Sequence, residues 1–185
     1  MIRGAAGLAA LAAALAPAGT MADSAPGRSA PLCDAIKDAI AVGERDWTFA
    51  SLQSKAIPLP SWADDPTKDN GVPALLRIDG FKCEIRTSMR SNTTPIESND
   101  LGGNTGFFEC SRYDLPDGGA EAGRIAETIG RCLGVAPVVG KAYYGHDYWF
   151  TWRDNTQIEV VVMPNGLKNE GVIVEVIADN PSPTF

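Results

Sequence analysis

One stretch, Phe107 to Gly134, limits the possible folds of this chain more than any other. It begins with the alternating apolar residues of a strand, turns at Pro-Asp-Gly-Gly and continues as an apolar stripe with helical spacing. Cys110 falls on the apolar face of the strand and Cys132 on the apolar stripe of the helix. The stretch therefore predicts an α+β fold in which a helix packs on one face of a sheet.

The first residues have the features of a secretory signal peptide. Arg3 gives a positively charged start, Gly4–Leu15 is an unbroken run of Ala, Gly and Leu, and small residues then suit cleavage after Ala18 or Ala22. The run is too short for a comfortable membrane span, and no later segment reaches the roughly 20 apolar residues that a span needs. We therefore expect export to the periplasm or the extracellular space, with a retained anchor as the weaker alternative.

The remaining length suits one domain with its own core rather than two. We expect, in chain order, a signal peptide, a flexible lead-in, a single α+β domain and a short C-terminal tail. The expected bounds of these four parts are 1–22, 23–30, 31–179 and 180–185.

Apolar spacing predicts two helices and about five strands in the order α-β-β-α-β-β-β. The first helix is expected over Leu32–Leu52, and the second between a cap at Asp117 and a stop at Gly134. The strand Phe81–Met89 alternates between an apolar and a polar face, which is typical of an antiparallel sheet covered on one side. We therefore expect an antiparallel sheet with both helices on one face. The residues of this strand expected to face the core are Phe81, Cys83, Ile85 and Met89.

Four widely spaced cysteines follow the leader, and none belongs to a Cys-x-x-Cys pair. In an oxidising compartment this pattern indicates two structural disulfides, rather than a zinc site or an activated redox thiol. We expect the pairs Cys33–Cys83 and Cys110–Cys132, because each would join one helix to one strand. The alternative is Cys83–Cys110 with Cys33–Cys132, strand to strand and helix to helix, and sequence alone does not decide between them.

The charge balance is acidic, with a formal net charge of −7. Removing the signal peptide takes away Arg3, which leaves 15 basic against 23 acidic residues and a net charge of −8. This balance argues against nucleic acid as a partner and permits a basic protein partner. The acidic segment Asp64–Gly71 lacks the alternating oxygen ligands of a calcium loop, so we expect no metal and no cofactor.

Six aromatic residues gather within ten positions at the start of the predicted C-terminal strands. They are Tyr143, Tyr144, Tyr148, Trp149, Phe150 and Trp152. Trp149 falls on the opposite strand face from Tyr148, so both faces cannot easily be core if helices cover only one. An exposed aromatic platform could anchor a protein partner or a ligand. The alternative is ordinary core packing on one face with a scattered surface tryptophan.

The single histidine, His146, is the only candidate for histidine-based acid–base chemistry. A base oriented by Asp147 would be the catalytic interpretation, and an exposed histidine in an aromatic loop is the alternative. Four glutamates stand at outward strand positions where some could be cross-strand neighbours: Glu84, Glu109, Glu159 and Glu175. We expect these to pair with Lys82, Arg86 and Arg153 rather than to form an acid pair.

These features favour an exported, non-enzymatic module that binds a protein or ligand, with an inhibitor as one form of it. The candidate binding residues are Tyr143, Tyr144, His146, Tyr148, Trp149 and Trp152. The alternatives are a small periplasmic hydrolase that uses His146 with a carboxylate, and an envelope-associated domain without a discrete site.

Overall fold

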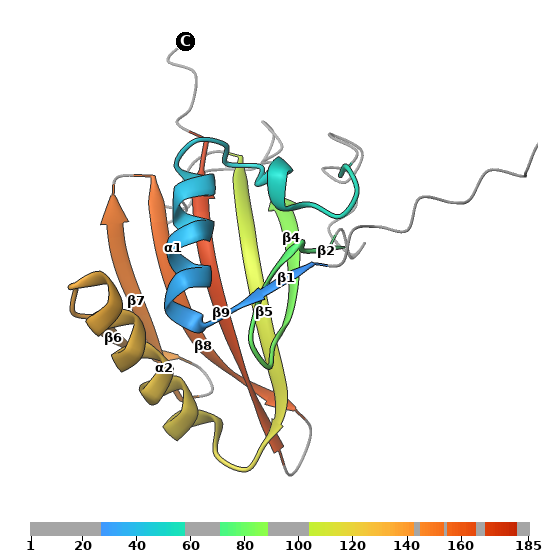
Figure 1. Ribbon diagram of the computed structural model, residues 1–185. Coiled ribbons are helices and arrows are strands. Elements are labelled where there is room, and N and C mark those ends of the chain that lie inside the picture. The colour runs from blue at the N-terminus through green and yellow to red at the C-terminus, as the bar shows by residue number, and fades with distance from the viewer. Residues whose placement is uncertain are drawn as a thin grey trace, which may run out of the picture.

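The chain folds into a large antiparallel sheet with two helices on one face (Figure 1). The computed structural model describes residues 27–57, 71–88, 104–142, 145–153, 155–165 and 169–180. The helices are α1 (Leu32–Gly43) and α2 (Gly118–Leu133), with a 3-10 turn η1 (Ala50–Leu52). The strands are β1 (Arg28–Ala30), β2 (Val72–Pro73), β3 (Leu76–Ile78), β4 (Lys82–Ser88), β5 (Thr105–Leu115), β6 (Val138–Ala142), β7 (Gly145–Arg153), β8 (Thr156–Asn165) and β9 (Asn169–Asp179).

The predicted α+β class and antiparallel sheet are confirmed, but the strand number and element order differ. The main sheet has seven strands in the order β2-β4-β5-β9-β8-β7-β6, and β1 pairs with β3 in a separate parallel pair. The additional strands β1, β2, β3 and β6 have two to five residues each, too few for a clear alternating pattern. Strand β1 includes the last residues of the expected flexible lead-in, where Arg28 donates its backbone N–H to Leu75. Residues 1–26 and the tail from 181 onward lie outside the described residues.

Helix α1 ends at Gly43, nine residues before the predicted end at Leu52. The carboxylate of Asp46 accepts hydrogen bonds from the backbone N–H groups of Thr48 and Ala50, which turns the chain away from the helix axis. Phe49 then takes a left-handed conformation, φ 52°, and buries its ring completely. The predicted single helix is therefore a helix followed by a turn and a short 3-10 segment.

The core lies between the two helices and the face of the sheet that they cover. Each helix contributes one stripe, and each central strand contributes alternate residues, as their spacing predicts. Cys83 and Ile85 of β4 are buried as predicted, while Met89 lies outside the described residues. The largest fully buried side chains include Phe49, Phe108, Phe150, Ile36, Ile85, Ile129, Ile158, Val160, Val174 and Val176.

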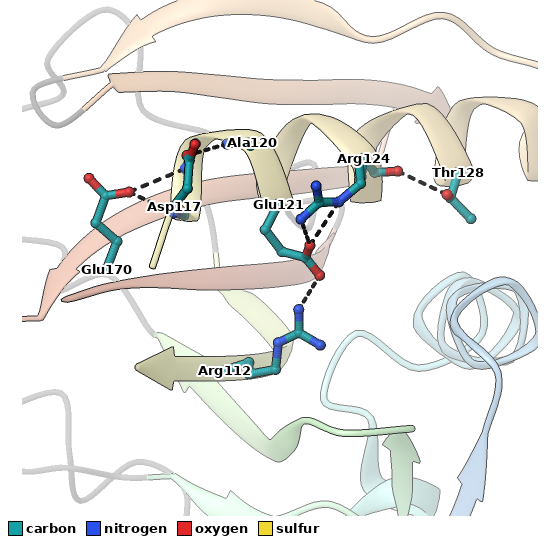
Figure 2. Close-up of polar contacts among 9 residues, drawn as sticks. Arg112, Asp117, Ala120, Glu121, Arg124, Thr128 and Glu170 are labelled. Atoms are coloured by element: carbon teal, nitrogen blue, oxygen red, sulfur yellow. Dashed lines mark hydrogen bonds and ion pairs between the residues drawn. The ribbon is translucent and has the colours of Figure 1, made fainter. Parts of the chain in front are cut away.

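Both predicted ends of α2 are confirmed. The Asp117 carboxylate accepts a hydrogen bond of 2.8 Å from the backbone N–H of Ala120, and Gly134 ends the helix at φ 70°. A second carboxylate, from Glu170 of β9, accepts from the backbone N–H of Gly118 at 2.7 Å (Figure 2). Two acidic groups therefore satisfy the first N–H groups of α2, and one of them attaches the helix to the sheet.

The disulfides are Cys33–Cys132 and Cys83–Cys110, so the predicted pairs Cys33–Cys83 and Cys110–Cys132 are wrong. Cys83 and Cys110 are buried in the core and Cys33 and Cys132 are half-buried, but burial alone does not decide which cysteines are neighbours. Helix α1 packs over β9 and against α2, which places Cys33 beside Cys132, with their Cα atoms 5.8 Å apart. Cys83 and Cys110 are directly opposite each other in the β4–β5 ladder, with Cα atoms 4.1 Å apart. The pairing is helix to helix and strand to strand.

Strand β5 passes unusually close to the segment after α1. A Cβ atom added at Gly106 would lie 1.7 Å from the carbonyl oxygen of Trp47. We therefore expect Gly106→Ala to lower the free energy of unfolding by about 3 kcal/mol, because backbone must move to relieve the overlap. Urea denaturation followed by tryptophan fluorescence measures this change.

The matched control for that substitution is Gly119→Ala in the first turn of α2. Its added Cβ would lie 3.6 Å from the Asp117 carboxylate, an ordinary contact, so a change of at most about 1 kcal/mol in either direction is expected. Equal stability of the two variants would contradict the close approach at Gly106.

Among the helices that the structure describes, none combines the length and apolar character required to cross a bilayer.

Candidate functional site

Four of the six candidate binding residues lie on one strand, β7. Tyr148 and Trp152 are half-buried on the helix-covered face, where they pack against the core on either side of the fully buried Phe150. Trp149 is half-buried on the opposite face, which neither α1 nor α2 covers and which we call the helix-free face (Figure 1). Tyr143 and Tyr144 lie outside the described residues. The aromatic strand thus has core packing on one face and one accessible indole on the other.

Strand β6 forms the edge of the sheet beside these aromatic residues. It pairs with β7 along one side, with Val138 opposite Trp149 and Val139 opposite Tyr148. No other strand of the described residues pairs with its outer side. Val138 is 57% exposed and Val139 56% exposed, the two most exposed large apolar residues in the described part of the chain. An exposed apolar edge of this kind is a template for pairing with another chain.

Strand β6 was not predicted from the sequence. Its one available signal was the pair Val138-Val139 immediately after Pro137, since valine favours extended backbone and proline begins rather than continues a strand. Five residues are too few to separate this signal from an ordinary loop.

Gly140 allows Trp149 to lie flat across β6 and β7. A Cβ atom at Gly140 would come within 2.1 Å of the Trp149 ring. The indole therefore covers the glycine on the helix-free face, next to the exposed edge strand. A ring held in this way provides apolar area with little loss of conformational entropy on binding.

His146 is exposed on β7, and its Nδ1 lies 3.4 Å from the carbonyl oxygen of Gly140. Successive strand residues point to opposite faces, so Asp147 is not placed to orient the imidazole. Burial raises the pKa of Asp147, and the nearby His146 opposes this shift. These positions do not resemble an oriented acid–base pair.

Two hollows on the described surface lie away from His146. One, of about 440 Å³, is beside β4, and the other, of about 400 Å³, lies between α1, α2 and β7. In the second hollow the Trp152 indole N–H and the Arg153 Nε each donate to Glu44 at 3.0 Å, which fixes Trp152 against α1. The lining residues of the second hollow are Lys37, Ile40, Ala41, Glu44, Cys132, Leu133, Trp152 and Arg153. The Trp152 contacts are those of a packed structural residue.

Four glutamates form a continuous row across the helix-free face. In the sheet ladder Glu84 of β4 is opposite Glu109 of β5, Glu109 is opposite Glu175 of β9, and Glu175 is opposite Glu159 of β8. The next position in the row is Trp149 of β7. We call these four residues the glutamate row. Like charges directly opposite one another destabilise a sheet, so the row requires neutralisation or protonation.

Among the described residues, the expected pairing with basic side chains is found only at one end of the glutamate row. Arg86 lies 2.7 Å from Glu84 and 3.2 Å from Glu109, and Lys82 lies 3.9 Å from Glu84. Arg153, which we expected to join this network, pairs with Glu44 of the α1 end instead. Among the described residues, neither Glu159 nor Glu175 forms an ion pair.

The unpaired end of the row is difficult to ionise. Burial raises the pKa of Glu175 to about 8, and the adjacent Glu109 and Glu159 act in the same direction, while Arg86 opposes them. Burial also raises the pKa of Glu159, with a further contribution from the charge of Asp147. The middle of the helix-free face therefore binds protons at a pH where glutamates are ordinarily ionised.

Within the described residues, no group of three or more His, Cys, Asp or Glu side chains is arranged to hold a metal ion. Comparisons with protein families, with curated proteins and with solved structures found no match to this chain.

Proposed function

We propose that this protein is a non-enzymatic binding module that takes up an extended segment of a protein partner along β6. The observation that carries this proposal is the edge position of β6 combined with the exposure of Val138 and Val139. An extended segment gains main-chain hydrogen bonds when it adds to such an edge, and its alternate side chains contact the neighbouring surface. Trp149 stands beside the edge as the aromatic anchor.

The chemistry around Trp149 favours a basic segment. Glu159 lies directly opposite Trp149 in the β7–β8 ladder, and Asp147 is close enough to Glu159 to raise its pKa. The whole chain carries a net charge of −7, which attracts a basic partner at long range. A segment that alternates basic and apolar residues would place a cation near these carboxyl groups and an apolar side chain on the indole.

The two disulfides support a site of action outside the cytoplasm, since such bonds persist mainly in oxidising compartments. A disulfide-bonded domain that presents an edge strand is suited to inhibit a secreted enzyme, which is the form of binding module we propose. The hydrolase alternative has less support, because His146 lines neither described hollow and Asp147 points to the opposite face of the strand.

A peptide-display selection on the immobilised protein, followed by calorimetry of the selected peptides, tests this function. We expect basic, extended sequences, and Val138→Lys is expected to weaken their binding at least about tenfold, because it adds a like charge beside the docked segment. Amide chemical shifts of β6 should move on binding.

The matched control is Met163→Lys, which makes the same change at an exposed apolar position on β8, away from the edge. Equal affinities of the two variants, or chemical shift changes confined to residues distant from β6, would reject this site.

A further inference from the structure

Glu109 and Glu175 occupy the centre of the glutamate row and of the sheet. They are directly opposite each other on β5 and β9, and the Glu109 carboxyl group contributes to the raised pKa of Glu175. Only 4% of Glu109 is exposed. An ionised carboxylate has no proton to donate, so a hydrogen bond between two carboxyl groups requires that one of them is protonated.

The neighbouring charges indicate where the proton resides. Arg86 lies 3.2 Å from Glu109 and favours its ionised form, while Glu175 forms no ion pair with a described residue. This asymmetry favours Glu175 as the partner that holds the proton and donates its O–H to the Glu109 carboxylate. Its pKa, which burial and Glu109 raise to about 8, agrees with this arrangement.

The carboxyl groups around the pair oppose a second negative charge. Glu84 of β4 and Glu159 of β8 flank the pair on either side, and Asp147 of β7 lies beyond Glu159. Arg86 and Lys82 of β4 are the described cations at this face, and both contact Glu84. The diagonal neighbours on β5, β9 and β8 do not titrate near neutral pH; they are Phe107, Ser111, Ile173, Ile177, Gln157 and Val161.

We propose that Glu109 and Glu175 form a pH-sensitive latch that joins β5 to β9 through one shared proton. When the pH rises, that proton passes to solvent and leaves two adjacent carboxylates beside the Arg86 guanidinium. Their repulsion weakens the β5–β9 contact at the middle of the sheet. The same step increases the negative charge of the row that ends at Trp149.

Carbon-13 NMR of the glutamate side-chain carboxyl groups in the full chain tests the latch. We expect one glutamate to titrate with a midpoint between about pH 7 and 9, well above the usual value near 4.3. That titration should be absent in Glu175→Gln, whose amide N–H can still donate to Glu109. It should persist in Glu127→Gln, a matched charge change on the exposed side of α2.

Amide hydrogen exchange gives a second measurement that needs no substitution. After correction for intrinsic exchange rates, protection of the β5 and β9 amides should fall at least tenfold between pH 7 and 9. Protection that stays constant over this range, or titration of every glutamate below about pH 6, would overturn the proposal.

Discussion

Replacing Cys33 and Cys132 by alanine is expected to lower the free energy of unfolding by about 4–5 kcal/mol. The two residues are separated by 99 positions, so their bond closes a loop that includes most of the described chain. The unfolded chain without this bond gains a correspondingly large conformational entropy. The bond also holds α1 against α2 over the sheet. Urea denaturation of the oxidised protein and of the double variant measures the difference.

Wild-type protein under reducing conditions is the control for this experiment, since reduction breaks the same bond without altering any residue. It should lose at least as much stability as the double variant, because the Cys83–Cys110 bond is then broken too. A double variant whose free energy of unfolding lies within about 1 kcal/mol of the wild type would show that the helices do not depend on this bond.

Wild-type stability is expected to decrease by roughly 3 kcal/mol as the pH rises from about 5 to 8, a direction opposite to that of ion-paired carboxylates. The pKa of Glu175 in the folded protein, about 8, lies above its ordinary value of 4.5. Between these values the folded chain binds more protons than the unfolded chain, so each increase in pH favours unfolding. The stabilisation of the folded state by the proton on Glu175 is complete at and below pH 4.5. It is lost as the pH approaches 8.

Glu175→Gln should remove most of this slope and make the variant more stable than the wild type at pH 8. Glu127→Gln, on the exposed side of α2, should keep the wild-type slope. The raised pKa values of Glu159 and Asp147 act in the same direction as that of Glu175, so a weaker slope of the same sign remains in the variant. Chemical denaturation of the wild type and both variants at several pH values measures how the free energy of unfolding depends on pH. A wild-type free energy of unfolding that rises from pH 5 to 8 would contradict the prediction.

Local patterns predicted the two helices and the five longer strands, because period-3.6 and period-2 spacing are properties of each segment alone. The caps of α2 at Asp117 and Gly134 were predictable for the same reason. The end of α1 was not, because the hydrogen bonds of Asp46 that turn the chain compete with a continuing helical stripe. Strand β6, with five residues, carries too little pattern to be recognised.

Strand order is the information that the sequence does not contain locally. Alternation placed Glu109 and Glu175 on the polar face, but they are neighbours only because β9 pairs with β5. The unknown strand order also explains the incorrect disulfide prediction. Cys83 lies opposite Cys110 only because β4 and β5 are adjacent in this register. Candidate residues on a single strand, such as Trp149, were easier to identify than contacts between strands.

The place of β9 in the sheet has a consequence for biosynthesis. This strand comes after all the other described strands in the chain, yet it lies between β5 and β8 in the middle of the sheet. A nascent chain that has emerged only as far as β8 presents two additional open strand edges, on β5 and β8, and lacks the segment that joins them. Such edges readily pair with other chains, so a truncated product would be prone to aggregate. The domain can complete its fold only after nearly its whole length has left the ribosome.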